Sequence, residues 1–181
     1  MDDQTLEKLR YPIGKFELPN PISEDQIVEW IKTLEAFPGK LEELVINLND
    51  SQLDTPYRPG GWTIRQVVHH LADSHTHSYI RFKWALTEDC PVIKYYYEQR
   101  WAELEDAKTS SINLGLDLLR SIHNKLVYLL KSLSEADLNK SFVHPEYNKE
   151  IPLKTNIGIY AWHCEHHYAH IKNLLNRKGW V

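Results

Sequence analysis

Four of the ten histidines in this chain lie in one short segment, residues 162–170, where they recur at helical spacing. His163 and His167 are four positions apart, so in a helix their imidazoles project from the same face. Two imidazoles on one rigid element supply half of the four-ligand shell that zinc prefers. A fold that uses this pair must therefore bring a third ligand to it from a distant part of the chain.

Helical periodicity distinguishes between the histidines of this segment. The apolar stripe of the helix is formed by Ile157, Tyr160, Cys164, Ile171, Leu174 and Leu175. His163 and His167 fall at the edge of this stripe, whereas His166 and His170 lie further out. The first pair is therefore predicted to face inward. A buried pair that is hydrogen-bonded without any cation remains an alternative.

A second histidine-rich stretch, residues 69–77, offers candidates for the third ligand. Its apolar stripe places His75 centrally and His70 on a different face, so periodicity alone favours His75. A helix in a bundle can present one face to the core and another to a cavity. Both histidines therefore stay open as ligands at this point.

Start signals place the first two long helices. Residues 1–22 are predicted to form an extended arm, because residues 11–21 contain three prolines and a glycine. Ser23 and Gln26 fit a capping box, which predicts a helix from about residue 24 to about 49, kinked or split at Pro38-Gly39. Thr63 and Gln66 fit a second box and open a helix through about residue 87.

The second half of the chain predicts two more long helices. Residues 89–110 read as an ordered crossover or lid, in which Tyr95, Tyr96, Tyr97 and Trp101 either line a pocket or serve as packing. A leucine stripe predicts a helix over about 112–133. Residues 141–154 suggest a short hairpin, after which Thr155 is predicted to cap a last helix that stops before Gly179. The prediction is an all-α four-helix bundle forming a single domain over residues 1–181.

Composition excludes several classes of partner. The formal charge is −4, and no basic stripe is present, so nucleic acid is not an expected partner. The chain has no apolar run of about 18 residues and no signal-peptide core, which predicts a cytoplasmic protein without a membrane association. Cys90 and Cys164 are too few for a disulfide framework and are expected to be reduced.

Known catalytic signatures are mostly missing. The zincin pattern H-E-x-x-H requires glutamate at position 164, where this chain has Cys164. No paired Glu-x-x-His motifs of a di-iron bundle, no nucleophile elbow and no phosphate-binding glycine loop occur. Cys164 is predicted to be a core residue and Glu165 a solvated or intersubunit carboxylate. No residue is assigned as a general acid or base.

Longer stretches of sequence carry a family resemblance. Residues 53–75, LDTPYRPGGWTIRQVVHHLADSH, are followed by YIRFK at 79–83 and by the histidine segment at 162–170. With these stretches the chain resembles the YfiT group of the DinB-like superfamily from Tyr11 almost to Trp180. The resemblance implies a four-helix bundle with up-down-down-up connectivity that forms homodimers.

The resemblance also implies a metal site and an activity. It points to His70, His163 and His167 as ligands of one divalent ion per chain, zinc or nickel, and so to His70 rather than His75. It implies a metal-dependent hydrolase that activates water towards a small-molecule substrate. Relatives that transfer or isomerise with bacillithiol or mycothiol make thiol S-transfer, from a low-molecular-weight thiol, the second hypothesis. A non-catalytic, dimeric metal-binding scaffold is the third.

Overall fold

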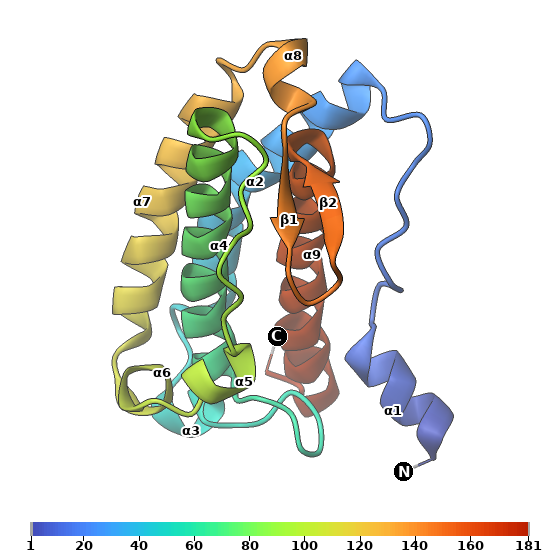
Figure 1. The fold of residues 1–181 in the computed structure, drawn as a ribbon. Coiled ribbons are helices and arrows are strands. Elements are labelled where there is room, and N and C mark those ends of the chain that lie inside the picture. The colour runs from blue at the N-terminus through green and yellow to red at the C-terminus, as the bar shows by residue number, and fades with distance from the viewer. Residues whose placement is uncertain (1, 181) are drawn as a thin grey trace.

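Four long helices build the protein in the computed structural model, which describes residues 2–180. They are α2 (Glu24–Val45), α4 (Ile64–Thr87), α7 (Ile112–Leu130) and α9 (Leu153–Lys178). Each packs on two others, in the ring α2, α7, α4, α9. In Figure 1, α4 and α7 run upward and α2 and α9 run downward. The predicted four-helix bundle and its up-down-down-up order are thus confirmed.

Short elements connect the bundle helices. They are α3 (Asp50–Leu53), α5 (Glu98–Trp101), α6 (Glu105–Thr109) and α8 (Glu135–Leu138). The suggested hairpin is present as strands β1 (Ser141–His144) and β2 (Lys149–Pro152), which pair antiparallel with Phe142 opposite Ile151. An isolated parallel bridge joins Val92 to Val143, so the crossover between α4 and α7 lies beside this hairpin.

The N-terminal prediction was wrong in part. Residues 3–10 form a helix, α1 (Asp3–Arg10), within the arm that was expected to be extended over residues 1–22. The Asp2 side chain caps it by accepting from the Thr5 amide. This short start signal precedes the proline-rich residues 11–21, which remain irregular. Figure 1 shows α1 lying beside the lower half of α9.

Helix α2 corrects a second prediction. Pro38 lies inside it, and the helix continues without a break to Val45. Proline removes only one backbone donor, and Phe37, Pro38 and Leu41 are all buried in the core, so packing holds the helix together. The predicted end near residue 49 was too late, because Asn49 instead caps the separate helix α3.

Caps define the other bundle helices. The capping box at Thr63 and Gln66 is confirmed, with both bonds present at the start of α4. The Thr155 cap was wrong: α9 begins at Leu153, directly after β2, and Pro152 precedes it without a side-chain bond. The Leu153 amide instead donates to the Lys140 carbonyl at 2.8 Å. Gly179 ends α9 with a φ of 64°, as expected of a C-cap glycine.

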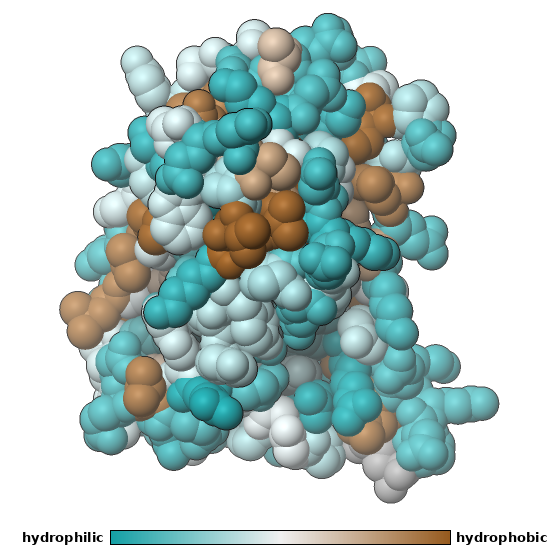
Figure 2. All heavy atoms as spheres, viewed as in Figure 1, coloured by the Kyte–Doolittle hydropathy of each residue, from teal (hydrophilic) through white to brown (hydrophobic). Residues whose placement is uncertain are grey.

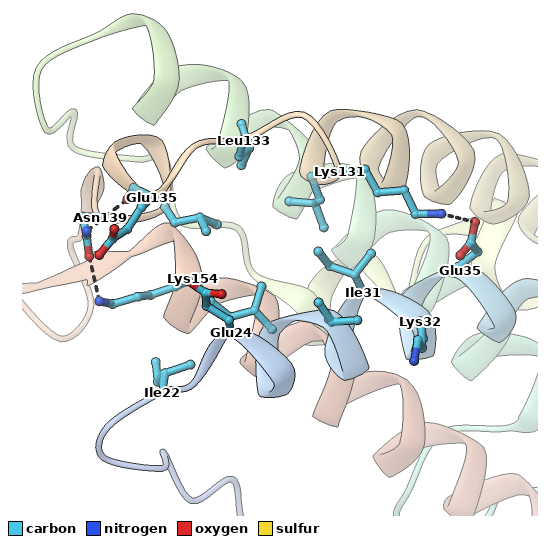
Figure 3. A pocket seen from close by; sticks show the side chains of 14 residues that line it. Ile22, Glu24, Ile31, Lys32, Glu35, Lys131, Leu133, Glu135, Asn139 and Lys154 are labelled. Atoms are coloured by element: carbon cyan, nitrogen blue, oxygen red, sulfur yellow. Dashed lines mark hydrogen bonds and ion pairs between the residues drawn. The ribbon is translucent and has the colours of Figure 1, made fainter.

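The visible surface is mainly hydrophilic, with small separate hydrophobic patches (Figure 2). No helix within residues 2–180 combines the length and apolar character needed to cross a bilayer. One hollow of about 570 Å³ lies where α8 meets the start of α2 (Figure 3). Ile31 and Leu133 form part of its apolar floor, and Lys131 pairs with Glu35 at its edge at 2.6 Å. Its lining contains no histidine or cysteine, so the metal-competent side chains lie elsewhere.

Candidate metal centre

The three histidines that the family resemblance implies come together between α4 and α9. His70 faces His163 and His167, and one ring nitrogen of each lies within 4.8 Å of the others. The Nε2 atoms of His70 and His163 are 3.3 Å apart. Three nitrogens at zinc distance in a tetrahedral shell would be separated by about 3.3 Å, since each bond is about 2.0–2.1 Å long. The donor set therefore fits a small divalent ion.

The charge state of these histidines also suits a cation. Burial lowers the pKa of His70 to about 3, and burial with neighbouring imidazoles lowers the pKa values of His163 and His167 well below their ordinary value. All three rings are neutral near pH 7. Each therefore keeps a nitrogen lone pair for a ligand bond.

His75, the ligand favoured by periodicity, lies behind this group. It is fully buried, as its central place on the α4 stripe predicts. Its Nε2 lies 3.2 Å from Nδ1 of His163, and its own cluster contains His123 and Cys164. His75 thus contacts the Nδ1 atom of His163, whereas His70 faces its Nε2 atom.

A line of hydrogen bonds continues from His75 into the core. Its Nδ1 lies 2.8 Å from Nε2 of His123 on α7, and Nδ1 of His123 lies 2.6 Å from the Leu34 carbonyl oxygen on α2. That carbonyl is available because Pro38, four residues later, lacks the amide hydrogen that would normally bond it within the helix. The proline inside α2 thus provides the end point of the line.

This end point assigns the tautomer of each ring. A carbonyl only accepts, so Nδ1 of His123 carries the hydrogen and donates to Leu34. Burial lowers the pKa of His123 to about 4 and that of His75 well below its ordinary value, so both rings are neutral. Nε2 of His123 then accepts from His75, and Nε2 of His75 accepts from His163. The Nε2 lone pair of His163 is left pointing towards His70.

His166 and His170 are more buried than their predicted outward positions suggest, at 8% and 3% exposure. The N-terminal segment covers them: Nε2 of His170 lies 2.9 Å from the Arg10 carbonyl, and the ring of Tyr11 packs 6.0 Å from that of His166. Periodicity missed this because the cover comes from outside the bundle. Both rings, with His167, form a further close imidazole cluster.

Of two neighbours on α9, Cys164 behaves as the sequence predicts, whereas Glu165 differs from the predicted solvated or intersubunit carboxylate because it forms an ion pair within the chain. Glu165 points away from the histidines and pairs with Lys40 on α2, at 2.7 Å. Cys164 is fully buried, and burial raises the pKa of its thiol well above the ordinary value. It is a protonated core residue rather than an activated nucleophile.

A pocket of about 580 Å³ opens over the three histidines. Aromatic rings make up much of its wall, and they come from several elements: Tyr57, Trp62, Tyr95, Tyr96, Tyr147 and Tyr160. The crossover after α4 thus contributes Tyr95 and Tyr96 to the pocket, whereas Tyr97 and Trp101 do not line it. The Trp62 ring lies 4.6 Å from that of His70 and closes one side of the group.

Comparison with known proteins agrees with this fold. The sequence model of the DinB superfamily matches residues 33–171. The chain belongs to the DinB superfamily. The matched residues include all of α4 and the part of α9 up to Ile171, and therefore His70, His163 and His167.

Individual relatives within the DinB superfamily cover almost the whole chain. "Putative metal-dependent hydrolase YfiT" from Bacillus subtilis is 48% identical over 97% of this chain and 99% of its own. A "Putative metal-dependent hydrolase" from Bacillus cereus is 51% identical over 97% of this chain and all of its own.

Solved structures give the same picture. The structure of YfiT, described as "a probable metal-dependent hydrolase with an unusual four-helix bundle topology", superposes with a TM-score of 0.94 over 96% of this chain and 99% of its own. The four-helix bundle protein TT2238, 21% identical with a TM-score of 0.54, covers 83% of this chain and 98% of its own. At that identity the second likeness concerns the fold alone.

Sequence reasoning missed two residues of this DinB superfamily site. His123 lies on α7 between the stripe residues Leu119 and Leu126, where a fully apolar helix face was expected. A polar residue at such a position was the available signal. Arg81 lies on α4, in the YIRFK stretch at 79–83, which indicated only the family resemblance. Its burial depends on the hairpin and on α9, which no local pattern indicates.

Proposed function

We propose that this protein is a metal-dependent hydrolase that holds one divalent ion, zinc or nickel, through His70, His163 and His167. The observation that carries the proposal is the meeting of three neutral imidazoles at the floor of a pocket. When bound, such an ion supplies Lewis acidity, which lowers the pKa of a water molecule or thiol that joins it. The relatives named as metal-dependent hydrolases support the same assignment.

The protein's own residues prepare this site in two ways. The line from the Leu34 carbonyl through His123 and His75 fixes the ring orientation and tautomer of His163. A hydrogen bond to the ring nitrogen that does not bind the metal holds a histidine ligand in its orientation. Trp62 and Tyr160 flank the group with ring surfaces and limit the approach of solvent.

Thiol transfer is the second candidate, and one observation favours it. The two carboxylates that line the pocket, Glu98 and Glu146, belong to none of the three metal-competent clusters among residues 2–180. Hydrolysis by activated water commonly uses a nearby general base, whereas a thiol held as thiolate attacks without one. A substrate pocket above the histidines suits either reaction.

Metal analysis tests the ligand assignment. We expect purified protein to carry close to one divalent ion per chain, and His70→Ala, His163→Ala and His167→Ala each to lose it, because two imidazoles hold the ion poorly. His166→Ala, on the same helix and equally buried, is the matched control and should keep it. Full occupancy in the His163 and His167 variants would refute the site. Loss of the ion in His75→Ala with retention of the ion in His70→Ala would assign His75 as the third ligand in place of His70.

Two activity screens then separate the chemistries. Esters and amides test hydrolysis without added thiol, and haloarenes or epoxides test conjugation with a panel of low-molecular-weight thiols. Rates count only if they disappear in His163→Ala. Activity independent of thiol supports the hydrolase, and activity that requires thiol supports the transferase. Absence of activity in both screens with several metals would favour a non-catalytic scaffold.

A further inference from the structure

Arg81 is a buried cation without a counterion. It lies on α4, faces the pocket above the histidines, and is only 8% exposed. Its one hydrogen bond to the protein is a long one, 3.3 Å from Nη1 to the Tyr160 hydroxyl oxygen. Its Nε is buried with no partner, and no carboxylate within residues 2–180 lies within ion-pair distance.

A second arginine on the same helix shows what a structural role looks like. Arg65 is equally buried, at 5% exposure. It donates to Asp54 at 2.7 Å, to Asp50 at 2.8 Å and to the Ser110 carbonyl at 2.9 Å. Every side of that guanidinium is occupied, and it ties α4 to α3 and to the start of α7. Arg81 has no carboxylate or carbonyl partner; its contacts with other elements are the long bond to Tyr160 on α9 and the ring of Phe142 on β1, 5.9 Å away. These contacts use one of its five N–H donors, so holding the elements together does not account for the others.

Within residues 2–180, no carboxylate pairs with Arg81 to compensate its charge. A guanidinium stays charged in proteins, so burial cannot be relieved by loss of a proton. Burial and then the charge of Arg81 lower the pKa values of His77 and His144, which keeps both rings neutral. Each of these rings also has a buried nitrogen without a partner. Of these atoms, Nε of Arg81 is always a donor, and its burial beside an unpaired charge indicates an acceptor that residues 2–180 do not supply.

We propose that Arg81 binds an oxyanion, a carboxylate or a phosphate, of the molecule that occupies this pocket. The planar fork of a guanidinium matches either group. Tyr160 connects this position to the histidines, since its hydroxyl meets Arg81 and its ring lies 5.7 Å from that of His163. The aromatic wall formed by Tyr95 and Tyr96 suits a flat apolar body attached to the anion.

This inference rests on the proposed function only in calling the bound anion a substrate, because binding an anion at Arg81 requires no metal. The substrate class that follows is an anionic small molecule whose charged end lies at Arg81 and whose reacting bond lies over the three histidines. An aromatic carboxylate fits the wall and the charge together. Glu98 and Glu146 also line the pocket, but neither forms an ion pair with Arg81.

Calorimetric titration tests the proposal with two probes, benzoate and inorganic phosphate. The protein is used as purified, with its metal content measured, and again after chelation. We expect at least one probe to bind in both forms and Arg81→Gln to weaken it by about tenfold or more, since a charge-assisted pair is lost. Arg10→Gln removes the same charge from an exposed arginine that lines the same pocket, and it should weaken binding by less than about twofold.

Comparing the two probes, and the protein before and after chelation, distinguishes the possible ligands and the role of the metal. Stronger binding of benzoate assigns a carboxylate, and stronger binding of phosphate assigns a phosphate. Binding that vanishes on chelation and is equal in wild type and Arg81→Gln would overturn the proposal. Arg81-dependent binding in protein that holds no metal would uphold it, even if the metal assignment fails.

Thermal melting guards against a variant that merely misfolds. Without ligand, Arg81→Met should melt at or above the temperature of wild type, because an unpaired buried charge is replaced by an apolar chain of similar length. Arg65→Met should melt lower, because it leaves two aspartates and a carbonyl without their partner. A large drop for Arg81→Met together with unchanged anion binding would make Arg81 structural and refute the proposal.

Discussion

Pro38 influences the histidine site because it lacks a backbone amide hydrogen. Its position in α2 leaves the Leu34 carbonyl free, and that carbonyl accepts from His123. From there each neutral ring has only one possible tautomer, as far as His163. A backbone feature of one helix thus decides which nitrogen of a side chain on another helix carries its lone pair.

His123→Phe should break this line while keeping the volume of the ring. We expect metal affinity to fall by about tenfold, the lower end of the effect of removing a direct partner of a histidine ligand, because His123 acts on His163 only through His75. The free energy of unfolding should fall by about 1–3 kcal/mol, because the Leu34 carbonyl and His75 lose their partner. Competition with a chromophoric chelator measures the affinity, and urea unfolding measures the stability.

His69→Gln is the control for this prediction. His69 lies beside His70 on α4 but bonds to the Ser110 hydroxyl, at 3.1 Å, outside the line. Its metal affinity should match wild type. A folded His123→Phe protein with unchanged metal affinity would show that the tautomer of His163 does not depend on the core histidines.

The sequence indicated part of this arrangement. Spacing and periodicity selected His163 and His167, because both residues lie on one helix and share a local period. The choice between His70 and His75 required the family resemblance, since it depends on which face of α4 meets α9. His123 and Arg81 could not be identified, because their partners lie on other elements and periodicity within one helix carries no information about them.

Two glycines in the bundle helices are in opposite situations. Gly158 on α9 lies against the indole of Trp30 on α2, where an added Cβ would come within 2.7 Å of the ring. Gly39 on α2 has nothing within 4 Å of the same position. The first glycine permits a close approach of two helices, whereas the second only weakens its own helix.

Alanine substitutions should separate these two roles. Gly39→Ala should raise the free energy of unfolding by about 0.5–1 kcal/mol through helix propensity. Gly158→Ala gains the same propensity but must displace the indole, and we expect a net loss of about 1–3 kcal/mol. Chemical denaturation of the two variants measures both. Equal stabilisation would mean that Trp30 moves aside freely and that α2 and α9 are not held at this distance.

Start and stop signals located whole elements well where the partners are local. The capping box at Thr63 marks the start of α4 at Ile64, and Gly179 marks the end of α9 at Lys178. The start of α9 was misplaced because a strand feeds directly into it, and a hairpin is a contact between segments. Helix α1 was overlooked for a different reason, since the prolines that follow it dominated the composition of the arm.

The whole molecule carries many histidines that are buried in the neutral state. Burial lowers the pKa values of His70 and His166 to about 3 and those of His123 and His170 to about 4. The unfolded chain binds protons on these side chains near pH 6.5, and the folded protein does not. Stability is therefore fully present above about pH 6.5 and is lost as pH falls below it.

Chelator-treated protein should show this loss directly. Each such histidine contributes up to about 1.4 kcal/mol for each pH unit below 6.5, so four of them would exceed 3 kcal/mol per unit, a large share of a typical stability. Urea unfolding at several pH values between 6.5 and 5 gives the slope. A slope of about 1.4 kcal/mol per unit or less would mean that no more than one histidine resists protonation in the folded protein.

Because α4 and α7 run in the same direction, residues 88–111 must return along the length of the bundle between them (Figure 1). Part of this connection lines the pocket. The wall carrying Tyr95 and Tyr96 is therefore part of a connecting segment, although Tyr96 stacks on His77 of α4 with ring centroids 4.2 Å apart. Substitutions and insertions there are tolerated more readily than in the helices. Changes in this connection could therefore alter which molecule the pocket accepts while leaving the three histidines on α4 and α9 in place.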